Sequence, residues 1–228
     1  MKNKKITLIA GVSLCAFVVA LAIVYAVITG ASVSAETNHT PPCDIDDSYA
    51  KEAILTVTEK GLMTTETKDG KIYFSPETEV TRTEIAKAII RYTNVDLKSY
   101  ETTALGFADE NQIPAEDLPY IRAALSQGYI KLNSDYTFRA DASISREEAA
   151  DIISSLCTPI LAAGKSERFK DFREISPHFE SGAKKTVDLE LMIGYPDDTF
   201  RPKANLTREE LALILHRLLK YDADSDIP

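Results

Sequence analysis

The sequence contains no tryptophan and only three cysteines and three histidines among its 228 residues. The cysteines and histidines do not stand at the spacing of a metal site, and no Ser-His-Asp arrangement can be assigned from them. A glycine-rich loop of the kind that cradles phosphate is also missing. A hydrolase would need paired carboxylates in a cleft, or a nucleophile with a base, and the sequence identifies neither. We therefore expect a non-enzymatic protein without a cofactor or a metal ion.

Positive charge is scarce as well. The chain has 26 Lys and Arg residues against 35 Asp and Glu residues, which gives a formal net charge of −9. A chain this acidic is a poor partner for nucleic acid or for anionic lipid. A ligand that carries negative charge would have to be bound by basic groups that are placed locally, against the overall field.

The N-terminal segment 1–35 differs from the rest of the chain. It begins with three lysines, continues with an apolar run from Ile6 to Ile28, and ends in Val33-Ser34-Ala35. This pattern predicts a signal peptide that is cleaved after Ala35. Because the run also reaches the roughly 20 residues that span a membrane, a retained membrane anchor is the alternative. In both cases the remainder is exported, and loss of 1–35 would change the formal charge from −9 to −12, because the segment holds three lysines and no acidic residue.

Two polar segments flank the rest of the chain. Residues 36–47 contain Pro41-Pro42 and are typical of a linker. Residues 222–228 are predicted to form a frayed acidic tail. Outside the cell, Cys43 and Cys157 can form a disulfide or remain two free thiols, and the sequence does not decide between the two.

Three repeats make up the part between these segments. Each copy contains a box in which Thr or Ser is followed by Arg and, three residues after the first position, by Glu. This is the sequence of a helix capping box. The boxes are Thr81-Arg82-Thr83-Glu84, Ser145-Arg146-Glu147-Glu148 and Thr207-Arg208-Glu209-Glu210. Seven residues before each box stands a phenylalanine, namely Phe74, Phe138 and Phe200. Motif spacing that is kept over three copies is stronger evidence for an internal repeat than any single motif.

Each repeat is predicted to contain two helices. The box opens an amphipathic helix with apolar residues at i, i+4 and i+7. A shorter helix is expected upstream, at Tyr49–Lys60, Leu118–Gln127 and Phe179–Leu189. The first repeat carries an insertion around Lys68-Asp69-Gly70. The repeats are assigned to residues 48–98, 105–160 and 167–221. Since about fifty residues bury little by themselves, the copies are expected to share one core.

These motifs resemble the S-layer homology (SLH) domain, whose hallmarks include Phe-x-Asp, Phe-x-Pro and a Thr-Arg-Ala-Glu box. The third repeat resembles it most closely, over residues 192–202, and the resemblance covers about residues 44–221. It implies an all-α fold in which three SLH repeats stand in a pseudo-threefold arrangement around a central three-helix bundle formed by the box helices.

The resemblance also implies a function. SLH domains bind a cell-wall polysaccharide non-covalently, in grooves between repeats, and so anchor a protein at the bacterial surface. In many Gram-positive bacteria this partner is a secondary wall polysaccharide with a pyruvate ketal, and a carboxylate suits an arginine at a helix N-terminus. The alternative is a degenerate SLH trimer that is held by an N-terminal transmembrane anchor and serves as a structural module or binds an unknown protein partner.

Carried over to this chain, the resemblance assigns the anion-binding role to the box arginines, Arg82, Arg146 and Arg208. Where the family often has a tryptophan, this chain has Tyr49, Glu116 and His178. Tyr49 keeps an aromatic face for a sugar, whereas His178 would favour an anion only when protonated. Glu116 puts a negative charge where an anion would approach.

Two further sets complete the implied site. The Phe-x-Asp aspartates, Asp109 and Asp171, are candidate acceptors for sugar hydroxyls. The glycines that would let the backbone approach a ligand are Gly61, Gly128 and Gly194.

Structural roles are the competing interpretation for the motif residues. A box arginine can be a solvated first-turn residue, placed against the helix dipole at a cost of about 0.3–1 kcal/mol. The box glutamates are expected to be caps, and the three phenylalanines are expected to be core anchors.

Overall fold

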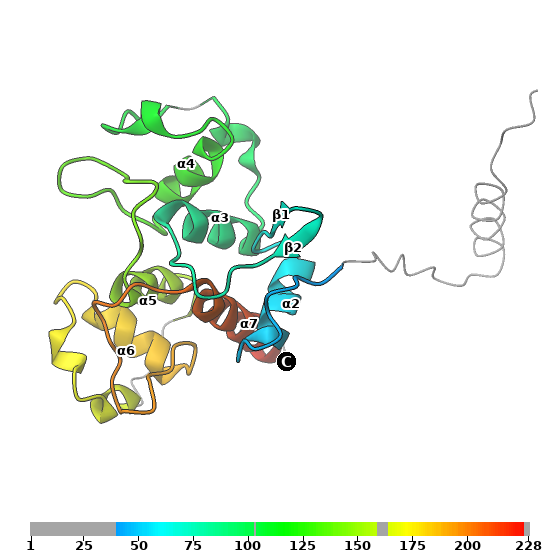
Figure 1. Cartoon of the computed structure of the whole chain (residues 1–228). Helices are drawn as coiled ribbons and strands as arrows, with labels where there is room; N and C mark the ends of the chain where they lie inside the picture. The colour runs from blue at the N-terminus through cyan, green and yellow to red at the C-terminus, as the bar shows by residue number, and fades with distance from the viewer. Residues whose placement is uncertain (1–39, 103, 159–163, 226–228) are drawn as a thin grey trace, which may run out of the picture. The chain divides into compact units, whose positions relative to one another are not determined.

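The computed structural model describes residues 40–102, 104–158 and 164–225 (Figure 1). The segment 1–35, predicted to be a signal peptide or membrane anchor, lies outside the described residues. Within the described ranges, no helix is both long enough and apolar enough to cross a membrane.

The described part of the chain is mostly helical, as predicted. The boxes open α3 (Arg82–Tyr92), α5 (Arg146–Ser154) and α7 (Arg208–Ser225). The shorter helices are α2 (Lys51–Glu59), α4 (Leu118–Ser126) and α6 (Glu180–Asp188), within two residues of their predicted bounds. Short 3₁₀ turns lie at Leu97–Tyr100, Glu110–Gln112, Lys165–Arg168 and Phe172–Glu174.

The C-terminal helix is longer than the sequence pattern predicts. Residues 222–228 were expected to be a frayed tail, but α7 continues to Ser225. The hydroxyl of Tyr92, at the end of α3, donates a hydrogen bond to the carboxylate of Asp222. The tail prediction is therefore wrong for its first residues, because a neighbouring helix supplies a partner that the local sequence does not show.

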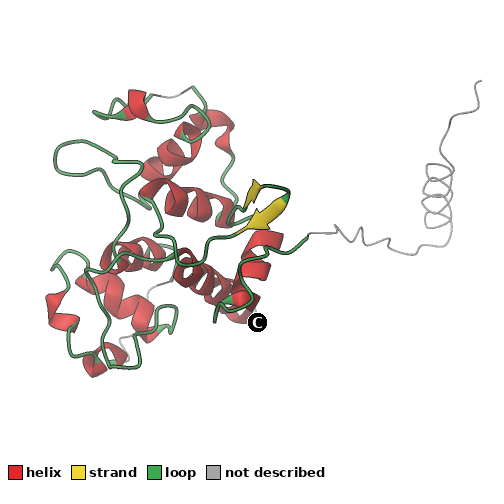
Figure 2. Cartoon of the chain, viewed as in Figure 1, coloured by secondary structure: helices red, strands yellow, loops and turns green. Residues whose placement is uncertain are grey.

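One element of the first repeat is a β-hairpin (Figure 2). Strand β1 (Glu66–Lys68) pairs antiparallel with β2 (Lys71–Tyr73). The turn residues Asp69 and Gly70 have φ values of 50° and 72°, which suits a two-residue hairpin turn. The insertion was expected here but the strands were not, because they are short and largely exposed and show no apolar alternation.

The helices pair between repeats. The shorter helix α4 of the second repeat packs on α3 of the first, and α6 of the third repeat packs on α5 of the second. The cycle closes with α2 of the first repeat on α7 of the third (Figure 1). Every repeat therefore buries its shorter helix against the box helix of the repeat before it.

The starts of the three box helices meet in a closed ring of backbone hydrogen bonds. Val80 donates to the carbonyl of Leu206 (2.8 Å), Leu206 donates to that of Ile144 (2.9 Å), and Ile144 donates to that of Val80 (2.9 Å). All three side chains are fully buried. The box helices thus converge at their N-terminal ends, while their sides pack against α2, α4 and α6.

The three phenylalanines that precede the boxes are core residues, which confirms the prediction for them. Phe74, Phe138 and Phe200 are among the largest fully buried side chains of the described residues. In the third repeat, Phe169 and Phe172 pack against Phe200 with ring centres 5.8 Å and 5.6 Å away. Each phenylalanine fixes the loop that leads into its box helix.

Candidate functional site

Each box arginine reaches into the loop of the next repeat. Its Nε donates to the carbonyl of that repeat's buried phenylalanine, and its Nη2 donates to a second carbonyl of the same loop. These bonds, of 2.6–3.2 Å, join Arg82 to Phe138 and Lys131, Arg146 to Phe200 and Ile193, and Arg208 to Phe74 and Thr64. The arginines therefore tie neighbouring repeats together, a role that local sequence does not reveal.

The third nitrogen of each guanidinium forms an ion pair with the glutamate of the next box. The pairs are Arg82 with Glu148, Arg146 with Glu210, and Arg208 with Glu84. The three pairs close a ring around the helix starts. Side-chain exposure is 5%, 3% and 13% for the three arginines, so none of them is the solvated first-turn residue of the competing interpretation. Burial lowers the pKa of Arg82 to about 10, which leaves it charged at neutral pH.

The capping boxes form as predicted at their first position. The hydroxyls of Thr81, Ser145 and Thr207 each accept a hydrogen bond from the backbone N–H of the box glutamate. In the reciprocal bond of a capping box, the backbone N–H of the cap residue donates to the glutamate side chain. Thr207 makes this bond, donating to Glu210 Oε2 at 3.0 Å. The prediction that the glutamate side chain caps its helix is thus confirmed for Glu210, and each of the three box glutamates pairs with an arginine of the preceding repeat.

The helix N-termini already have protein partners. The first N–H of α3, α5 and α7 donates to the carbonyl of Ala142, Ala204 and Thr78, respectively. The second donates to the carbonyl of Ala140, Pro202 and Pro76. The third is bound by the cap hydroxyl. The expected anion site at unpaired N–H groups is therefore not formed at these helices, and a ligand-binding role for the box arginines rests on their guanidinium groups alone.

One pocket gathers three of the predicted site residues. Its volume is about 400 Å³, and its walls include Tyr49 of the first repeat, Arg146 of the second and Gly194 of the third. The remaining walls include Ile193, Tyr195, Glu210, Ile214 and Arg217. All three repeats therefore contribute to one site, which the sequence alone could not establish.

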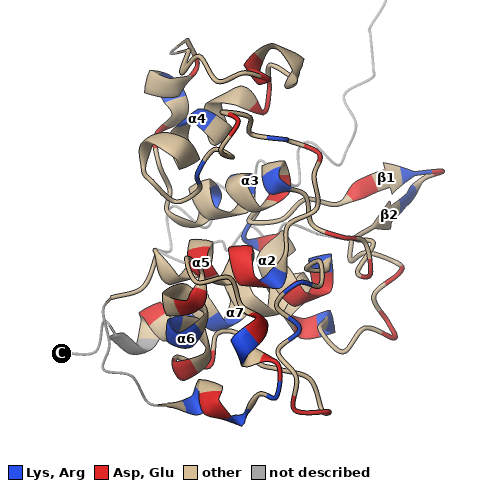
Figure 3. Ribbon diagram, turned by 90° about the vertical axis from the view of Figure 1, so that its left-hand side faces the viewer, with Lys and Arg blue, Asp and Glu red and all other residues tan. Residues whose placement is uncertain are grey.

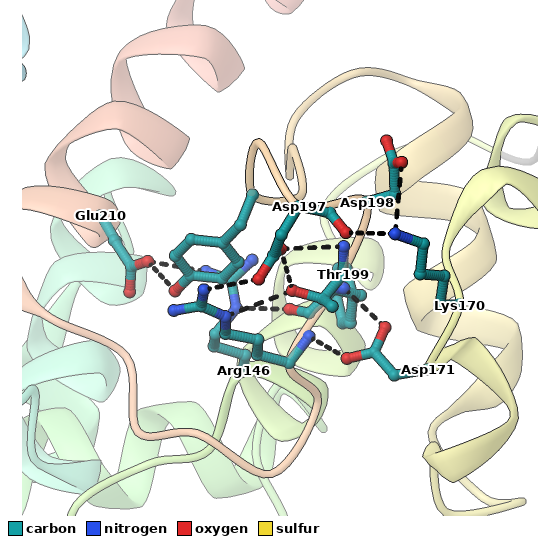
Figure 4. Close-up of polar contacts among 10 residues, drawn as sticks. Arg146, Lys170, Asp171, Asp197, Asp198, Thr199 and Glu210 are labelled. Carbon is teal, nitrogen blue, oxygen red and sulfur yellow. Dashed lines mark hydrogen bonds and ion pairs between the residues drawn. The ribbon is translucent and has the colours of Figure 1, made fainter.

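The interior of the pocket is organised by Arg146 and Glu210 (Figure 4). The guanidinium carbon of Arg146 lies 4.8 Å from the ring centre of Tyr195 and 5.1 Å from that of Phe200. Glu210 Oε1 accepts hydrogen bonds from Arg146 (3.0 Å) and from the Tyr195 hydroxyl (2.5 Å). Burial and the bond to Glu210 raise the pKa of Tyr195 to about 12, so its hydroxyl remains a donor at neutral pH.

The three positions at which the SLH family often has a tryptophan are equivalent in the structure. Tyr49, Glu116 and His178 each stand directly before the N-cap of α2, α4 and α6. Tyr49 is 69% exposed at the pocket, where its ring is open to a ligand. His178 is also exposed, but its ring lies 3.9 Å from that of Phe179 and it does not line this pocket.

The two predicted aspartates hold the backbone. Both oxygens of Asp109 accept N–H groups, from Phe138 and Arg139, at 2.7 Å. Asp171 does the same with Phe200 and Arg201 (Figure 4). The residue after each phenylalanine has a positive φ, which these paired bonds stabilise. A ligand hydroxyl would have to share these oxygens with the backbone.

Asp44 makes the same contacts in the first repeat, with the N–H groups of Phe74 (2.9 Å) and Ser75 (2.7 Å). It was missed because no phenylalanine precedes it. Its spacing was the available signal, because Asp44 lies 30 residues before Phe74 and Asp109 lies 29 before Phe138.

The three glycines have two different roles. Gly61 and Gly128 follow α2 and α4 with φ values of 68° and 74°, and a Cβ at either would meet nothing within 4 Å. At Gly194, a Cβ would lie 2.0 Å from the Phe169 ring and 2.6 Å from the carbonyl of Thr199. Gly194 is therefore required by close packing at the pocket wall, whereas the other two end helices.

Cys43 and Cys157 are both free thiols in this structure. Cys43 is exposed, and its N–H donates to the carbonyl of Ile72 in the hairpin. Cys157 is buried at the end of the second repeat's box helix, and burial raises the pKa of its thiol. The open alternative of a disulfide between them is not what the structure shows.

A second hollow, of about 750 Å³, lies in the third repeat and is lined by residues such as Phe172, Arg173 and Lys184. None of the predicted site residues lines it. One of its lining residues, Gly164, directly follows residues outside the described ranges. Along the described ribbon as a whole, Lys and Arg are interspersed with Asp and Glu (Figure 3). The smaller pocket is therefore the candidate site.

The model of the S-layer homology domain matches residues 106–150 and 168–212 of this chain. These matches cover most of the second and third repeats, from the Phe-x-Asp motif to the box helix.

Several curated proteins are similar to the chain. Cell surface glycoprotein 1 of Acetivibrio thermocellus is 26% identical over 162 residues, which are 64% of this chain and 7% of the relative. The cellulosome-anchoring protein of the same species is 30% identical over 156 residues, 64% of this chain and 33% of the relative. The amylopullulanase of Thermoanaerobacterium thermosulfurigenes is 27% identical over 186 residues, 78% of this chain and 9% of the relative. The chain thus spans at most a third of the length of these relatives.

Proposed function

Because the chain belongs to the S-layer homology domain family, we propose that it binds a cell-wall polysaccharide non-covalently and is thereby anchored at the bacterial surface. The family model matches two of its repeats, and two of the similar proteins are named for the cell surface or for anchoring. The proposed ligand is a secondary wall polysaccharide with a pyruvate ketal. The proposed location is the cell wall, after export directed by residues 1–35.

The proposed architecture is a pseudo-threefold ring of three SLH repeats with the box helices at its centre. Two closed cycles support it, the ring of backbone hydrogen bonds and the ring of ion pairs. The region 48–98 is included as the first repeat, although the family model does not match it. Its support is the pair of hydrogen bonds that Asp44 accepts from the backbone N–H groups of Phe74 and Ser75, an arrangement that we call the aspartate clamp. The contacts of Arg208 with Phe74 and Thr64 support it as well.

The observation that carries the proposal is the pocket that unites Tyr49, Arg146 and Gly194 from three repeats. An exposed tyrosine ring and an apolar wall suit the flat face of a sugar, and guanidinium groups suit a carboxylate. The carboxylate in the pocket, Glu210, is bound by Arg146, by Tyr195 and by the N–H of Thr207. With its oxygens engaged in this way, Glu210 is not placed to act as a general acid or base, which supports binding without catalysis.

The alternative, a degenerate trimer that serves only as a structural module, is not favoured. A purely structural role would not account for the pocket or for the exposed Tyr49 ring. In addition, the similar proteins include one named for anchoring.

Co-sedimentation with purified cell-wall sacculi tests the proposal. We expect the protein to sediment with native sacculi and to remain in the supernatant after the secondary polysaccharide has been removed chemically. Equal sedimentation with both preparations would mean that another wall component is bound, and no sedimentation would count against wall binding altogether.

A further inference from the structure

The candidate pocket contains two arginines whose surroundings differ. Arg146 is matched by Glu210, with Nη1 and Oε1 3.0 Å apart, and its Nε and Nη2 are held by carbonyls of the third repeat. The other oxygen of Glu210 accepts the N–H of Thr207. The positive charge of Arg146 is therefore compensated inside the protein, and its guanidinium forms part of the wall.

Arg217 lies within α7 and lines the same pocket. Its Nη1 donates to the carbonyl of Leu191 at 3.1 Å. No ion pair between Arg217 and an acidic side chain is found in the described part of the chain. Burial lowers its pKa, as expected for a cation that is partly removed from water. A desolvated cation without a counter-charge is unfavourable, and an anionic ligand would remove that cost.

The first repeat contains a matching arginine with a different environment. Arg91 and Arg217 both stand nine residues after the arginine of their box. Both donate Nη1 to the carbonyl of the leucine that follows the shorter helix, Leu62 or Leu191. However, the guanidinium carbon of Arg91 lies 5.3 Å from the ring centre of Tyr120. Arg91 is thus covered by an aromatic side chain, whereas Arg217 faces the pocket.

We propose that Arg217, and not Arg146, binds the negative charge of the ligand, a carboxylate on a sugar. This proposal rests on the proposed function, because it assigns a residue to the same polysaccharide site. In this arrangement, Tyr49 contacts a sugar face at the mouth of the pocket. Arg146 and Glu210 hold the wall, and Arg217 supplies the charge that selects an acidic sugar over a neutral one.

Calorimetry with two forms of the wall polysaccharide tests this assignment. The native pyruvylated form is compared with the same polymer after mild acid has removed the ketal. We expect the wild-type full-length protein to bind the pyruvylated form roughly ten- to hundredfold more tightly, the range of a charged hydrogen bond. In Arg217→Gln this preference should vanish. Arg91→Gln, the matched control, should keep it, and Arg217→Lys should recover part of it.

The proposal is overturned if Arg217→Gln keeps the wild-type preference while its circular dichroism shows a folded protein. Failure of the wild type to bind either polymer counts instead against the proposed function. In that case D-glucuronate, titrated in an NMR experiment, decides on Arg217. Shifts in the wild type that are absent in Arg217→Gln would support the charge site, and equal or absent shifts in both proteins would overturn it.

Discussion

The loops of the second and third repeats share a pattern of backbone hydrogen bonds but carry different side chains. Asn133 N–H donates to the carbonyl of Thr137 at 2.9 Å, and Tyr195 N–H donates to that of Thr199 at 2.8 Å. In each loop, an arginine of the preceding repeat binds two carbonyls and an adjacent glutamate.

Two of the differences between these loops lie at the pocket wall. The place of Gly194 is taken by Leu132, and that of Tyr195 by Asn133. The Arg, Glu and Phe of the motif therefore build the ring that joins the repeats. The side chains between these motif positions decide whether a loop borders a pocket that suits a sugar.

The largest expected effect is the loss of stability when an arginine of the ion-pair ring is removed, and its size should depend on how deeply the ion pair is buried. In Arg146→Met, the buried Glu210 loses its counter-charge, and we expect the free energy of unfolding to fall by about 3–5 kcal/mol. In Arg208→Met the loss should be smaller, because the Arg208 and Glu84 side chains are 13% and 21% exposed. Urea unfolding followed by circular dichroism measures both. Losses below about 1 kcal/mol for both variants would show that the ring does not stabilise the fold.

A smaller loss is expected where Gly194 packs on Phe169. In Gly194→Ala, the new methyl group overlaps the Phe169 ring and the Thr199 carbonyl, so a loss of about 3 kcal/mol and a disturbed pocket wall should follow. Gly128→Ala is the matched control. It meets no neighbour within 4 Å and should cost only the strain of its positive φ, about 1–2 kcal/mol. Thermal unfolding gives the order of the two, and the reverse order would contradict the close packing at Gly194.

The aspartate clamps allow the first repeat to be compared with the third. Asp44→Asn and Asp171→Asn each weaken two charged hydrogen bonds to backbone N–H groups, and each should lower stability by about 1.5–3 kcal/mol. Chemical unfolding of the two variants provides the comparison. If Asp44→Asn alone were neutral, the first repeat would not use the clamp of the other two.

The smallest effect is an acid-pH dependence that arises in the loop turns. Hydrogen bonds from Thr199 and Arg201 lower the pKa of Asp197 to about 2 from its ordinary value of 3.8, and Asp135 behaves alike with Thr137 and Arg139. Because the folded pKa lies below the unfolded one, this stability is complete above about pH 4 and is lost as the pH falls toward 2.

Asp135→Asn and Asp197→Asn, alone and combined, should flatten the change of melting temperature between pH 4 and pH 2. The shift should be slight, because both carboxylates are exposed. A melting curve that depends on pH as steeply in the double variant as in the wild type would exclude these two groups as its source.

The sequence predicted the parts of the fold that depend on local pattern. Apolar periodicity and cap residues located the helices, because these signals act within one or two turns. At the hairpin, the Asp69-Gly70 dipeptide suits the turn, but the strands on either side are short and exposed and show no apolar alternation that would have predicted them. The extension of α7 past Asp222 depends on a contact with Tyr92, which lies 130 residues away.

The site was predicted only in part, for the same reason. The resemblance to the SLH domain made Tyr49, Arg146 and Gly194 candidate site residues, but it could not show that three different repeats bring them together. Nor could it show that Arg146 is compensated by a glutamate of another repeat. Arg217 was missed, because it lies outside every motif and gains its meaning from the pocket that it lines.

The affinity of Tyr49→Ala for purified secondary wall polysaccharide tests the central claim, that this pocket binds the polymer, most directly. Tyr49 is 69% exposed, so its removal leaves the core intact, and Tyr136→Ala is a matched control, since Tyr136 is 72% exposed and lies outside the pocket. By calorimetry, Tyr49→Ala should bind roughly tenfold or more weakly than the wild type, as for an aromatic hot spot, while Tyr136→Ala should bind equally well. Wild-type affinity in Tyr49→Ala would contradict the assignment of this pocket.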